Sequence, residues 1–326
     1  MINFIIIGGG WRAEFYLRIA KALPEKFNVS AICVRNHERA NYIRDHFNVN
    51  VVSTIEDALK ASFDFIVNCI NKDDISELSV ELADKGYYVL AETPVTKPQL
   101  GIHNYDNIQI AEQFHLKGTY QAIKSIIDSG IIGKVVHINM SMAHDYHAMS
   151  LIRFLLNDYD EPKLLGNFSF KDTMLETNGR SGELSDKKII DKAQKVRLYQ
   201  FKNATAIYDY NIEQYFSPIR KDRLLIRGTR GEIENNQVRH FNKNDEFVCS
   251  EIKHLTSGLL DGFYKDKIVF ENSVLYDYPY KYARLSEEEN AIAECLTKMK
   301  NFIQEKELLY SFKMAYEDYL FCVLEE

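Results

Sequence analysis

The stretch Ile2–Ala13, INFIIIGGGWRA, decides the fold of the N-terminal part of the chain. Its first six residues are an almost unbroken apolar run, which is typical of a strand buried on both faces. Three glycines follow, and apolar side chains then recur at helical spacing, at Phe15, Tyr16, Ile19, Ala20 and Leu23. A strand, a glycine turn and a helix in this order are the context that a dinucleotide-binding site requires.

The spacing of the small residues predicts a structural role for each of them in such a site. Gly8 allows the tight turn, Gly10 lets a pyrophosphate approach the backbone, and Ala13 lets the helix pack close to its strand. The N-terminus of the helix adds N–H groups and the positive end of its dipole. We therefore assign Gly8, Gly10, Trp11, Arg12 and Ala13 to cofactor binding. The alternative is a glycine-rich turn in an α/β domain that binds no nucleotide.

The composition of the chain excludes several kinds of protein and several kinds of partner. With 326 residues, of which 46% are hydrophobic and 27% charged, we expect a soluble globular chain of two domains. A net charge of −7 argues against binding to nucleic acid, which normally needs a basic surface. The five cysteines form no C-x-x-C pair and are typical of reduced cytoplasmic thiols. No apolar run approaches the roughly 20 residues of a membrane span, and the chain opens on a strand instead of a basic leader. We expect a cytoplasmic protein whose partner is a small molecule, with neither nucleic acid nor membrane as a partner.

Strand-like and helix-like segments alternate through the first third of the chain. Repeated βα units of this length predict a doubly wound parallel sheet, covered by helices on both faces. The predicted domain is an α/β dinucleotide-binding domain over residues 1–118. After the first strand, its further strands are predicted at Val29–Val34, Phe63–Cys69, Tyr88–Ala91 and Asn107–Ala111.

The pattern changes after about residue 118. A helix at Thr119–Ser129 is followed by many segments with the two-residue period of antiparallel strands, for example Leu198–Tyr210. Glu176–Lys195 is polar and is interpreted as a mobile excursion. Ser286 opens a helix that runs toward Phe302. We predict an α+β domain over residues 119–326, with a broad, mainly antiparallel open sheet.

Five motifs follow one another along the chain: Gly8–Ala13, Ala91–Pro94 (AETP), Ile126–Val135 (IIDSGIIGKV), His147–Leu156 (HAMSLIRFLL) and Leu224–Ile233 (LLIRGTRGEI). In these motifs and in their order, the chain resembles the Gfo/Idh/MocA family of NAD(P)-dependent oxidoreductases. The resemblance implies a Rossmann-type N-terminal half and an open-sheet C-terminal half. It also implies hydride transfer with a small polar substrate, such as a sugar derivative, and a homodimer formed through the C-terminal sheet.

The end of the second predicted strand bears on the choice of cofactor. An acidic residue there usually binds the ribose hydroxyls of NAD, but Ile32–Asn36 contains none. Arg35 is suited to pair with the 2′-phosphate of NADP. We therefore assign Arg35 and Asn36 to the cofactor and predict NADP, with NAD as the alternative. In the other interpretation, Arg35 is a solvated residue that opens the next helix. Cys69, at a strand end, and Glu92 are also assigned to the cofactor site.

The resemblance also shows which catalytic groups this chain lacks. A lysine in a Glu-Lys-Pro element typically handles the substrate proton in the family, and Thr93 occupies that position here. A threonine hydroxyl forms hydrogen bonds but does not cycle protons near neutral pH. An aspartate four residues before the histidine of the helix is replaced by Ala143, and one a turn further on by Ser150. Of three expected catalytic groups, namely the lysine, the aspartate before the helix and the histidine, two are therefore absent.

The remaining candidates lie around residue 147. We assign His147 as the proton-handling group, because histidine titrates near neutral pH, with His144, Asp145 and Thr93 as further catalytic candidates. Asp145 is alternatively the N-cap of the helix, and His147 is alternatively a cap or core residue. His144 and His147 have the spacing of metal ligands, but no third ligand is evident, so no metal is predicted. Gln113, His115 and Tyr146 are assigned to the substrate.

Two other functions remain open. An imine substrate needs less help from an enzyme acid than a ketone does, so a chain without the lysine is compatible with an imine reductase. A non-catalytic NAD(P)-binding sensor or regulator on the same fold would also lose catalytic groups. Further candidates are Arg180 and Arg220 for an anionic substrate. A group of aromatic residues lines a pocket, lines a dimer interface or simply packs the sheet: Tyr208, Tyr210, Tyr215 and Phe216.

Overall fold

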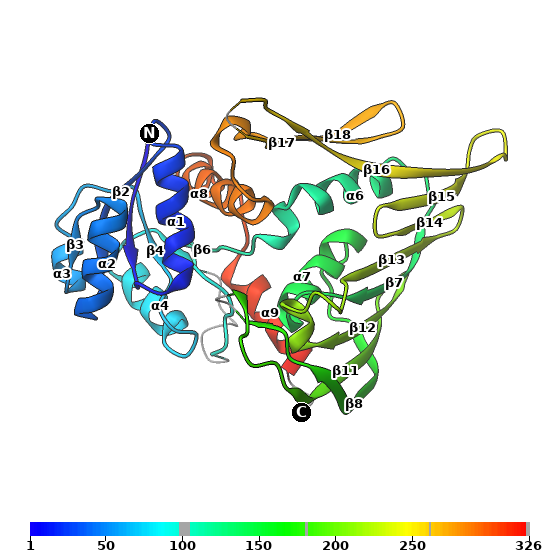
Figure 1. The fold of residues 1–326 in the computed structure, drawn as a ribbon, viewed down its shortest axis with the longest axis horizontal. Coiled ribbons are helices and arrows are strands. Elements are labelled where there is room, and N and C mark those ends of the chain that lie inside the picture. The colour runs from blue at the N-terminus through cyan, green and yellow to red at the C-terminus, as the bar shows by residue number, and fades with distance from the viewer. Residues whose placement is uncertain (98–104, 180–181, 261, 324–326) are drawn as a thin grey trace. The chain divides into compact units, whose positions relative to one another are not determined.

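The computed structural model describes residues 1–97, 105–179, 182–260 and 262–323. These residues divide into two compact units (Figure 1). The first unit comprises Met1–Gly118, Leu255–Lys267 and Asp277–Leu320, and the second comprises Thr119–His254, Ile268–Tyr276 and the residues from Phe321 onward. That residues 119–326 form a domain of their own stays a proposal.

The first unit is built on a six-stranded sheet in which every pair of neighbours is parallel. Its strand order, β3-β2-β1-β4-β5-β6, is that of the doubly wound dinucleotide-binding fold, as predicted. Its elements are β1 (Ile2–Ile7), α1 (Trp11–Ala22), β2 (Phe27–Cys33), α2 (His37–Phe47), β3 (Val51–Val52), α3 (Ile55–Ala58), β4 (Phe65–Asn68), α4 (Ile75–Asp84), β5 (Val89–Ala91), β6 (Ile108–Ile110), the 3-10 turn η1 (Phe114–Leu116), η3 (Lys281–Ala283), α8 (Glu287–Glu305) and α9 (Phe312–Val323), the last of which ends in the second unit.

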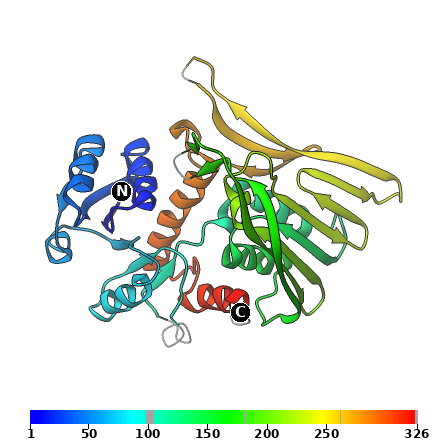
Figure 2. The ribbon, with the colours of Figure 1, turned by 60° about the horizontal axis from the view of Figure 1, so that its bottom comes forward.

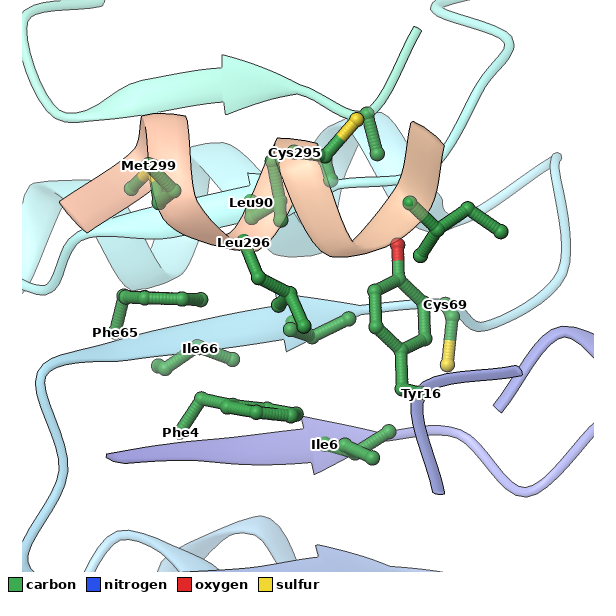
Figure 3. Close-up of a cluster of buried hydrophobic side chains, with 14 of the residues drawn as sticks. Phe4, Ile6, Tyr16, Phe65, Ile66, Cys69, Leu90, Cys295, Leu296 and Met299 are labelled. Carbon is green, nitrogen blue, oxygen red and sulfur yellow. The ribbon is translucent and has the colours of Figure 1, made fainter. Parts of the chain in front are cut away.

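Helix α8 belongs to the core of the first unit although it comes late in the chain. Ser286 and Glu289 form a capping box at its start, so this predicted helix start is confirmed. Figure 3 shows Cys295, Leu296 and Met299 of α8 among the buried side chains of the sheet and of α1. All three of these α8 side chains are fully buried. Because these side chains of α8 are buried against the six-stranded sheet, α8 is part of the dinucleotide-binding fold.

The second sheet has ten strands, in the order β18-β17-β16-β15-β14-β13-β7-β12-β11-β8. Of the described strand registers, only β12–β7 is parallel, which confirms the predicted mainly antiparallel sheet. Its strands are β7 (Val135–Ser141), β8 (Lys163–Leu175), β11 (Ile189–Gln200), β12 (Thr205–Asn211), β13 (Arg223–Gly228), β14 (Gly231–Glu234), β15 (Gln237–Phe241), β16 (Phe247–Ser257), β17 (Tyr264–Phe270) and β18 (Ser273–Asp277); a separate pair is β9 (Asn178–Gly179) and β10 (Gly182–Glu183).

One local prediction in this region is wrong. The polar segment Glu176–Lys195 is predicted as a mobile excursion, but its residues from Ile189 onward begin β11, which pairs with β8 from Ile189 to Gln200. Its polar side chains are compatible with a strand because one face of the sheet is open to solvent. The strand-like alternation of Leu198–Tyr210 is confirmed as the end of β11 and β12, separated by a turn that Phe201 and Ala204 close.

Helices α6 (Gly118–Asp128) and α7 (Asp145–Leu156) lie against one face of the broad sheet (Figures 1 and 2). Ile138 and Met140 of β7 are buried, whereas Phe168 and Phe170 of β8 are more than half exposed. Successive side chains of a strand point to opposite faces of the sheet. One face is therefore covered, and the other has exposed aromatic side chains. Among the described residues, no helix is long and apolar enough to cross a membrane.

Candidate functional site

The glycine turn has the geometry that the sequence predicts for a phosphate-binding site. Gly8 has φ +113°, and a Cβ there would lie 2.7 Å from the carbonyl oxygen of Cys69. A Cβ on Gly9 would lie 2.7 Å from the side chain of Val34. A Cβ on Gly10, in contrast, would meet no atom within 4 Å. Gly8 and Gly9 are therefore required by the fold, whereas Gly10 leaves the backbone open to a ligand.

The N-terminus of α1 adds the electrostatic part of this site. Gly10 is its N-cap, with no side chain to cap the helix, and Trp11 beside it is 45% exposed. The positive end of a 12-residue helix thus lies at an accessible backbone. These residues fit the pyrophosphate of a dinucleotide, whose negative charge the dipole and the N–H groups would stabilise.

Arg39 of α2 supports the glycine turn, although no pattern in the sequence singles out this residue. Its Nε donates to the carbonyl of Gly9 at 2.6 Å, and its guanidinium also pairs with Glu14 of α1. The same guanidinium lies 4.8 Å from the ring centre of Tyr42. Arg39 thereby joins α2 to the glycine turn and to α1.

Arg12 and Glu92, both assigned to the cofactor, are bonded to each other. Arg12 Nε lies 2.9 Å from Glu92 Oε2, and the two side chains are only 13% and 7% exposed. The other carboxylate oxygen of Glu92 accepts a hydrogen bond from the hydroxyl of Tyr16. The glycine turn and the end of β5 are therefore joined by a largely buried ion pair.

Glu288 of α8 extends this ion pair. Its Oε1 accepts from Arg12 Nη1 at 3.1 Å and from Gln113 Nε2 at 2.8 Å, and its Oε2 lies 2.5 Å from Lys117 Nζ. We call this set the Arg12 network; it comprises Arg12, Tyr16, Glu92, Gln113, Lys117 and Glu288. Glu288 and Lys117 were missed by sequence reasoning. The run of three glutamates at 287–289 was a signal, because a capping box uses only one of them.

The network determines the ionisation of its members. Burial alone would raise the pKa of Glu288, but Lys117 and Arg12 outweigh it and hold the pKa at about 2. Burial alone would lower the pKa of Arg12, but Glu92 and Glu288 raise it above its ordinary value. Both groups are therefore charged at neutral pH.

Of the other cofactor candidates, Arg35 is exposed just beyond the end of β2. Asn36 is the N-cap of α2, and its side chain accepts from the backbone N–H of Arg39 at 2.9 Å. The thiol of Cys69 lies beneath the glycine turn and donates to the carbonyl of Ile7 at 3.5 Å. Burial raises the pKa of Cys69, so the group stays a thiol.

The remaining candidates of the first unit lie beyond β5 and β6. Thr93 follows Glu92 and is joined to Pro94 by a cis peptide bond. The ring of His115, in η1, lies 5.3 Å from that of Tyr310. Burial lowers the pKa of His115 to about 4, so its ring is neutral at pH 7. Of the predicted substrate residues, Gln113 is the one that joins the Arg12 network.

In the second unit, the candidates His144, Asp145, Tyr146 and His147 gather at the start of α7. His144 is the N-cap, so Asp145 is the first helical residue instead of the cap. Asp145 lies 3.4 Å from Arg197 Nη1 and 3.5 Å from Lys195 Nζ, both of β11. His147 is 6% exposed, and its ring lies 4.4 Å from that of Tyr146.

The two positions at which the family aspartates are replaced have local structural roles. Ala143 adopts φ +61°, and its carbonyl accepts from the Tyr208 hydroxyl at 3.1 Å. The Ser150 hydroxyl donates to the carbonyl of His147 at 3.2 Å. Arg220 lies 3.4 Å from Asp172, and Arg180 lies outside the described residues. In the described part of the chain, no three His, Cys, Asp or Glu side chains are grouped so that they could hold a metal ion.

The glycine turn generates a matched pair of variants. Gly8→Ala is expected to lower the free energy of unfolding by about 2 kcal/mol or more, because of its positive φ and the close Cys69 carbonyl. Gly10→Ala has open space and is expected to change stability by less than about 1 kcal/mol while weakening dinucleotide binding several-fold. Urea unfolding and fluorescence titration measure the two effects. Equal stability losses would contradict the assigned roles.

The lowered pKa of Glu288 predicts how the stability of the fold depends on pH. Because the folded pKa of about 2 lies below the unfolded value of 4.5, the Glu288 carboxylate stabilises the fold above pH 4.5. This contribution is lost as pH falls from 4.5 to about 2. Glu288→Gln should lower the free energy of unfolding at pH 7 by on the order of 2 kcal/mol and flatten its pH dependence in that window. Glu305→Gln, an exposed position on the same helix, is the control. An unchanged pH profile in Glu288→Gln would refute the role of the network.

Comparisons with known proteins agree with the dinucleotide-binding fold of the first unit. Residues 2–113 match the Gfo/Idh/MocA model, described as an oxidoreductase family with an NAD-binding Rossmann fold. A search of curated proteins found no match.

Several solved structures share the fold of nearly the whole chain. An oxidoreductase from Agrobacterium radiobacter, in complex with NAD+, L-tartaric acid and magnesium, is 14% identical with a TM-score of 0.66, over 98% of this chain and 94% of that one. Levoglucosan dehydrogenase with NADH and levoglucosan is 15% identical with a TM-score of 0.67, over 98% and 95%. A putative myo-inositol dehydrogenase from Sinorhizobium meliloti is 14% identical with a TM-score of 0.61, over 99% and 95%. At these identities the similarity shows the fold. The predicted family is confirmed by the match over residues 2–113, and this N-terminal domain belongs to the Gfo/Idh/MocA family of NAD-binding oxidoreductases.

Proposed function

We propose that the chain is an NAD(P)-dependent oxidoreductase that transfers a hydride to or from a small polar substrate, either a sugar derivative or an imine. The observation that carries the proposal is the glycine turn, in which Gly8 is required by the backbone and Gly10 leaves the start of α1 accessible. The bound cofactor supplies hydride chemistry at the nicotinamide C4. Names of the structural neighbours, levoglucosan dehydrogenase and a putative myo-inositol dehydrogenase, support a sugar or polyol as substrate.

The contacts of the first unit refine the proposed cofactor site. Trp11 and Ala13 would contribute their backbone at the start of α1, together with Gly8 and Gly10. Arg12 would contribute little charge to the phosphates, because its guanidinium pairs with Glu92 and Glu288. We propose that Arg12 and Glu92 shape this site and that Cys69 supports the turn from below.

His147 is proposed to hold and release the substrate proton. It lies at the start of α7 beside Tyr146, and Asp145 nearby is paired with Arg197 and Lys195. Thr93 is proposed to donate a hydrogen bond, since its hydroxyl cannot cycle protons near neutral pH. An imine, which is protonated near neutral pH, would depend less on an enzyme acid than a ketone would.

NADP is proposed as the preferred cofactor. Arg35 is exposed two residues beyond the end of β2, where dinucleotide folds contact the ribose, and no acidic residue lies between β2 and Glu38. A guanidinium at this position is suited to pair bidentately with a 2′-phosphate. The neighbours solved with NAD+ or NADH are only about 15% identical to this chain and do not determine its preference.

The cofactor preference is tested at Arg35. The wild-type protein should bind NADPH more tightly than NADH, by about tenfold or more. Arg35→Asp should reverse the order by removing the phosphate partner and supplying a ribose acceptor. Titration of cofactor fluorescence measures both affinities, with Arg44→Asp on the exposed part of α2 as the charge-matched control. Tighter NADH binding by the wild type would overturn the preference.

The role of His147 is tested by kinetics. His147→Ala should lower kcat by about a hundredfold or more, because general acid–base catalysis typically contributes that much. NADPH affinity should be unchanged. His137→Ala is a matched control in the same unit, where His137 bonds to Thr205 of the neighbouring strand. A variant with full turnover would show that His147 does not handle the proton.

A non-catalytic NAD(P)-binding sensor is the second candidate function. The observation that favours it is the replacement of the family lysine by Thr93, together with Ala143 and Ser150 at the two aspartate positions. Such a protein would bind the dinucleotide and move no hydride. Either function is proposed to operate in the cytoplasm.

A homodimer formed through the broad sheet is proposed for both functions. Phe168 and Phe170 are 62% and 55% exposed on β8, on the sheet face away from the buried Tyr199. Burial of such aromatic side chains between two copies would stabilise the assembly.

A further inference from the structure

An exposed apolar surface lies at the connection between β16 and β17, in the first unit (Figure 2). Of the large hydrophobic side chains that the structure describes, the four most exposed are those of Leu260, Leu259, Tyr282 and Phe263, with exposed fractions of 94%, 87%, 79% and 72%. We call these four residues the apolar tip. Single exposed apolar side chains are common, but a group of them in one place is typical of an interaction surface.

Two glycines determine the backbone on either side of the exposed leucines. Gly258 has φ +114°, and a Cβ there would lie 2.3 Å from the carbonyl oxygen of Gly262. Gly262 has φ +89°, which residues with a side chain rarely adopt. The connection therefore requires glycine at both positions, and the conformation that exposes Leu259 and Leu260 is written into the sequence.

Contacts within the first unit anchor the apolar tip to the segment that precedes α8. Asp266 of β17 accepts a hydrogen bond from Ser257 Oγ at 2.8 Å, and its other carboxylate oxygen lies 2.7 Å from Lys281 Nζ. The ring of Tyr264 lies 5.1 Å from the ring of Tyr282. These contacts bring Tyr282 beside β17, so two segments of the chain form one continuous surface.

Charged side chains beside the apolar tip pair with one another. Lys281 Nζ lies 2.7 Å from a carboxylate oxygen of Asp266 and 2.5 Å from one of Asp277. A partner that covers the tip would therefore leave these charges paired. An apolar centre with a polar rim is the usual composition of a protein–protein interface. An anionic lipid surface is a less suitable partner, because the chain has a net charge of −7.

The size of the apolar tip suits contact with a second copy of the chain. At about 150–250 Å² for a large side chain, four that are exposed to this extent present roughly 600 Å². That area is about as large as the largest apolar patch on a typical monomer. Two tips in contact would remove about 1,200 Å² from water, which reaches the lower end of the range for stable, specific interfaces.

We propose that the apolar tip forms a two-fold contact with the apolar tip of a second copy of the chain, so that the same four side chains of each copy are buried against the other. This contact is distinct from the sheet-face contact proposed above, since Phe168 and Phe170 belong to the second unit. Two different two-fold contacts raise the assembly from two chains to four. The inference depends on neither a bound cofactor nor hydride transfer.

The test is the molar mass of the full chain in solution, measured by light scattering during size-exclusion chromatography. Leu260→Asp should halve the mass, because the contact would bury an unpaired carboxylate. The change is from four chains to two, or from two to one if the sheet-face contact does not form. Leu308→Asp, at an exposed leucine of the same unit outside the tip, is the matched control and should leave the mass unchanged. Unchanged circular dichroism verifies that both variants fold.

The outcomes separate this inference from other occupants of the tip and from the proposed function. A monomeric wild type, or Leu260→Asp with the mass of the wild type, would overturn the inference. Binding of the wild type but not of Leu260→Asp to vesicles of phosphatidylcholine and phosphatidylglycerol, with equal masses in solution, would identify a lipid surface as the occupant and would also overturn it. A halved mass in Leu260→Asp sustains the inference even if the chain transfers no hydride.

Discussion

The ion pair between Arg12 and Glu92 is the constraint on which the dinucleotide-binding unit depends. A guanidinium this far from solvent needs a carboxylate within hydrogen-bonding distance, and the chain supplies one from the end of β5 and a second from α8. Removing one partner of a buried pair leaves an uncompensated charge at a cost of about 3–5 kcal/mol. The pair therefore holds the glycine turn, the end of β5 and the start of α8 in one arrangement.

This arrangement has a consequence for recognition. Because carboxylates already neutralise Arg12, the negative charge of a bound pyrophosphate would be met mainly by the backbone at Gly10 and the dipole of α1. We propose that Arg35, two residues beyond the end of β2, then discriminates the ribose end of the cofactor. In the second unit, one carboxylate, that of Asp145, likewise pairs with two cations, Lys195 and Arg197.

Local patterns in the sequence predicted the local structures well. The apolar run Ile2–Ile7 and the glycines after it are confirmed as β1 and the turn before α1, because strand burial and positive φ leave a direct signature in residue type. The capping box at Ser286 is confirmed for the same reason. The strand β11 was misread, since a strand with one solvated face has polar residues that are equally typical of a loop.

The pairing of distant residues was out of reach of the sequence. Nothing in Arg12 or Glu92 alone shows that they bond to each other, and the apolar face of α8 does not say which sheet covers it. The candidates around His147 were placed by a family motif. The structure adds what the motif lacks, namely that Asp145 pairs with Arg197 and that His144 contacts Tyr210. Long-range contacts of this kind depend on the whole fold and leave no short-range pattern.

Transfer of deuterium from C4 of stereospecifically labelled NADPH tests the central claim most directly, that this fold binds the dinucleotide in order to move a hydride. Incubation with a panel of cyclic polyol-derived ketones and imines, followed by mass spectrometry of the products, should show the label transferred to substrate carbon from one face of the nicotinamide only. Tight binding of NADPH without transfer of label to any member of the panel would contradict the claim and favour the sensor.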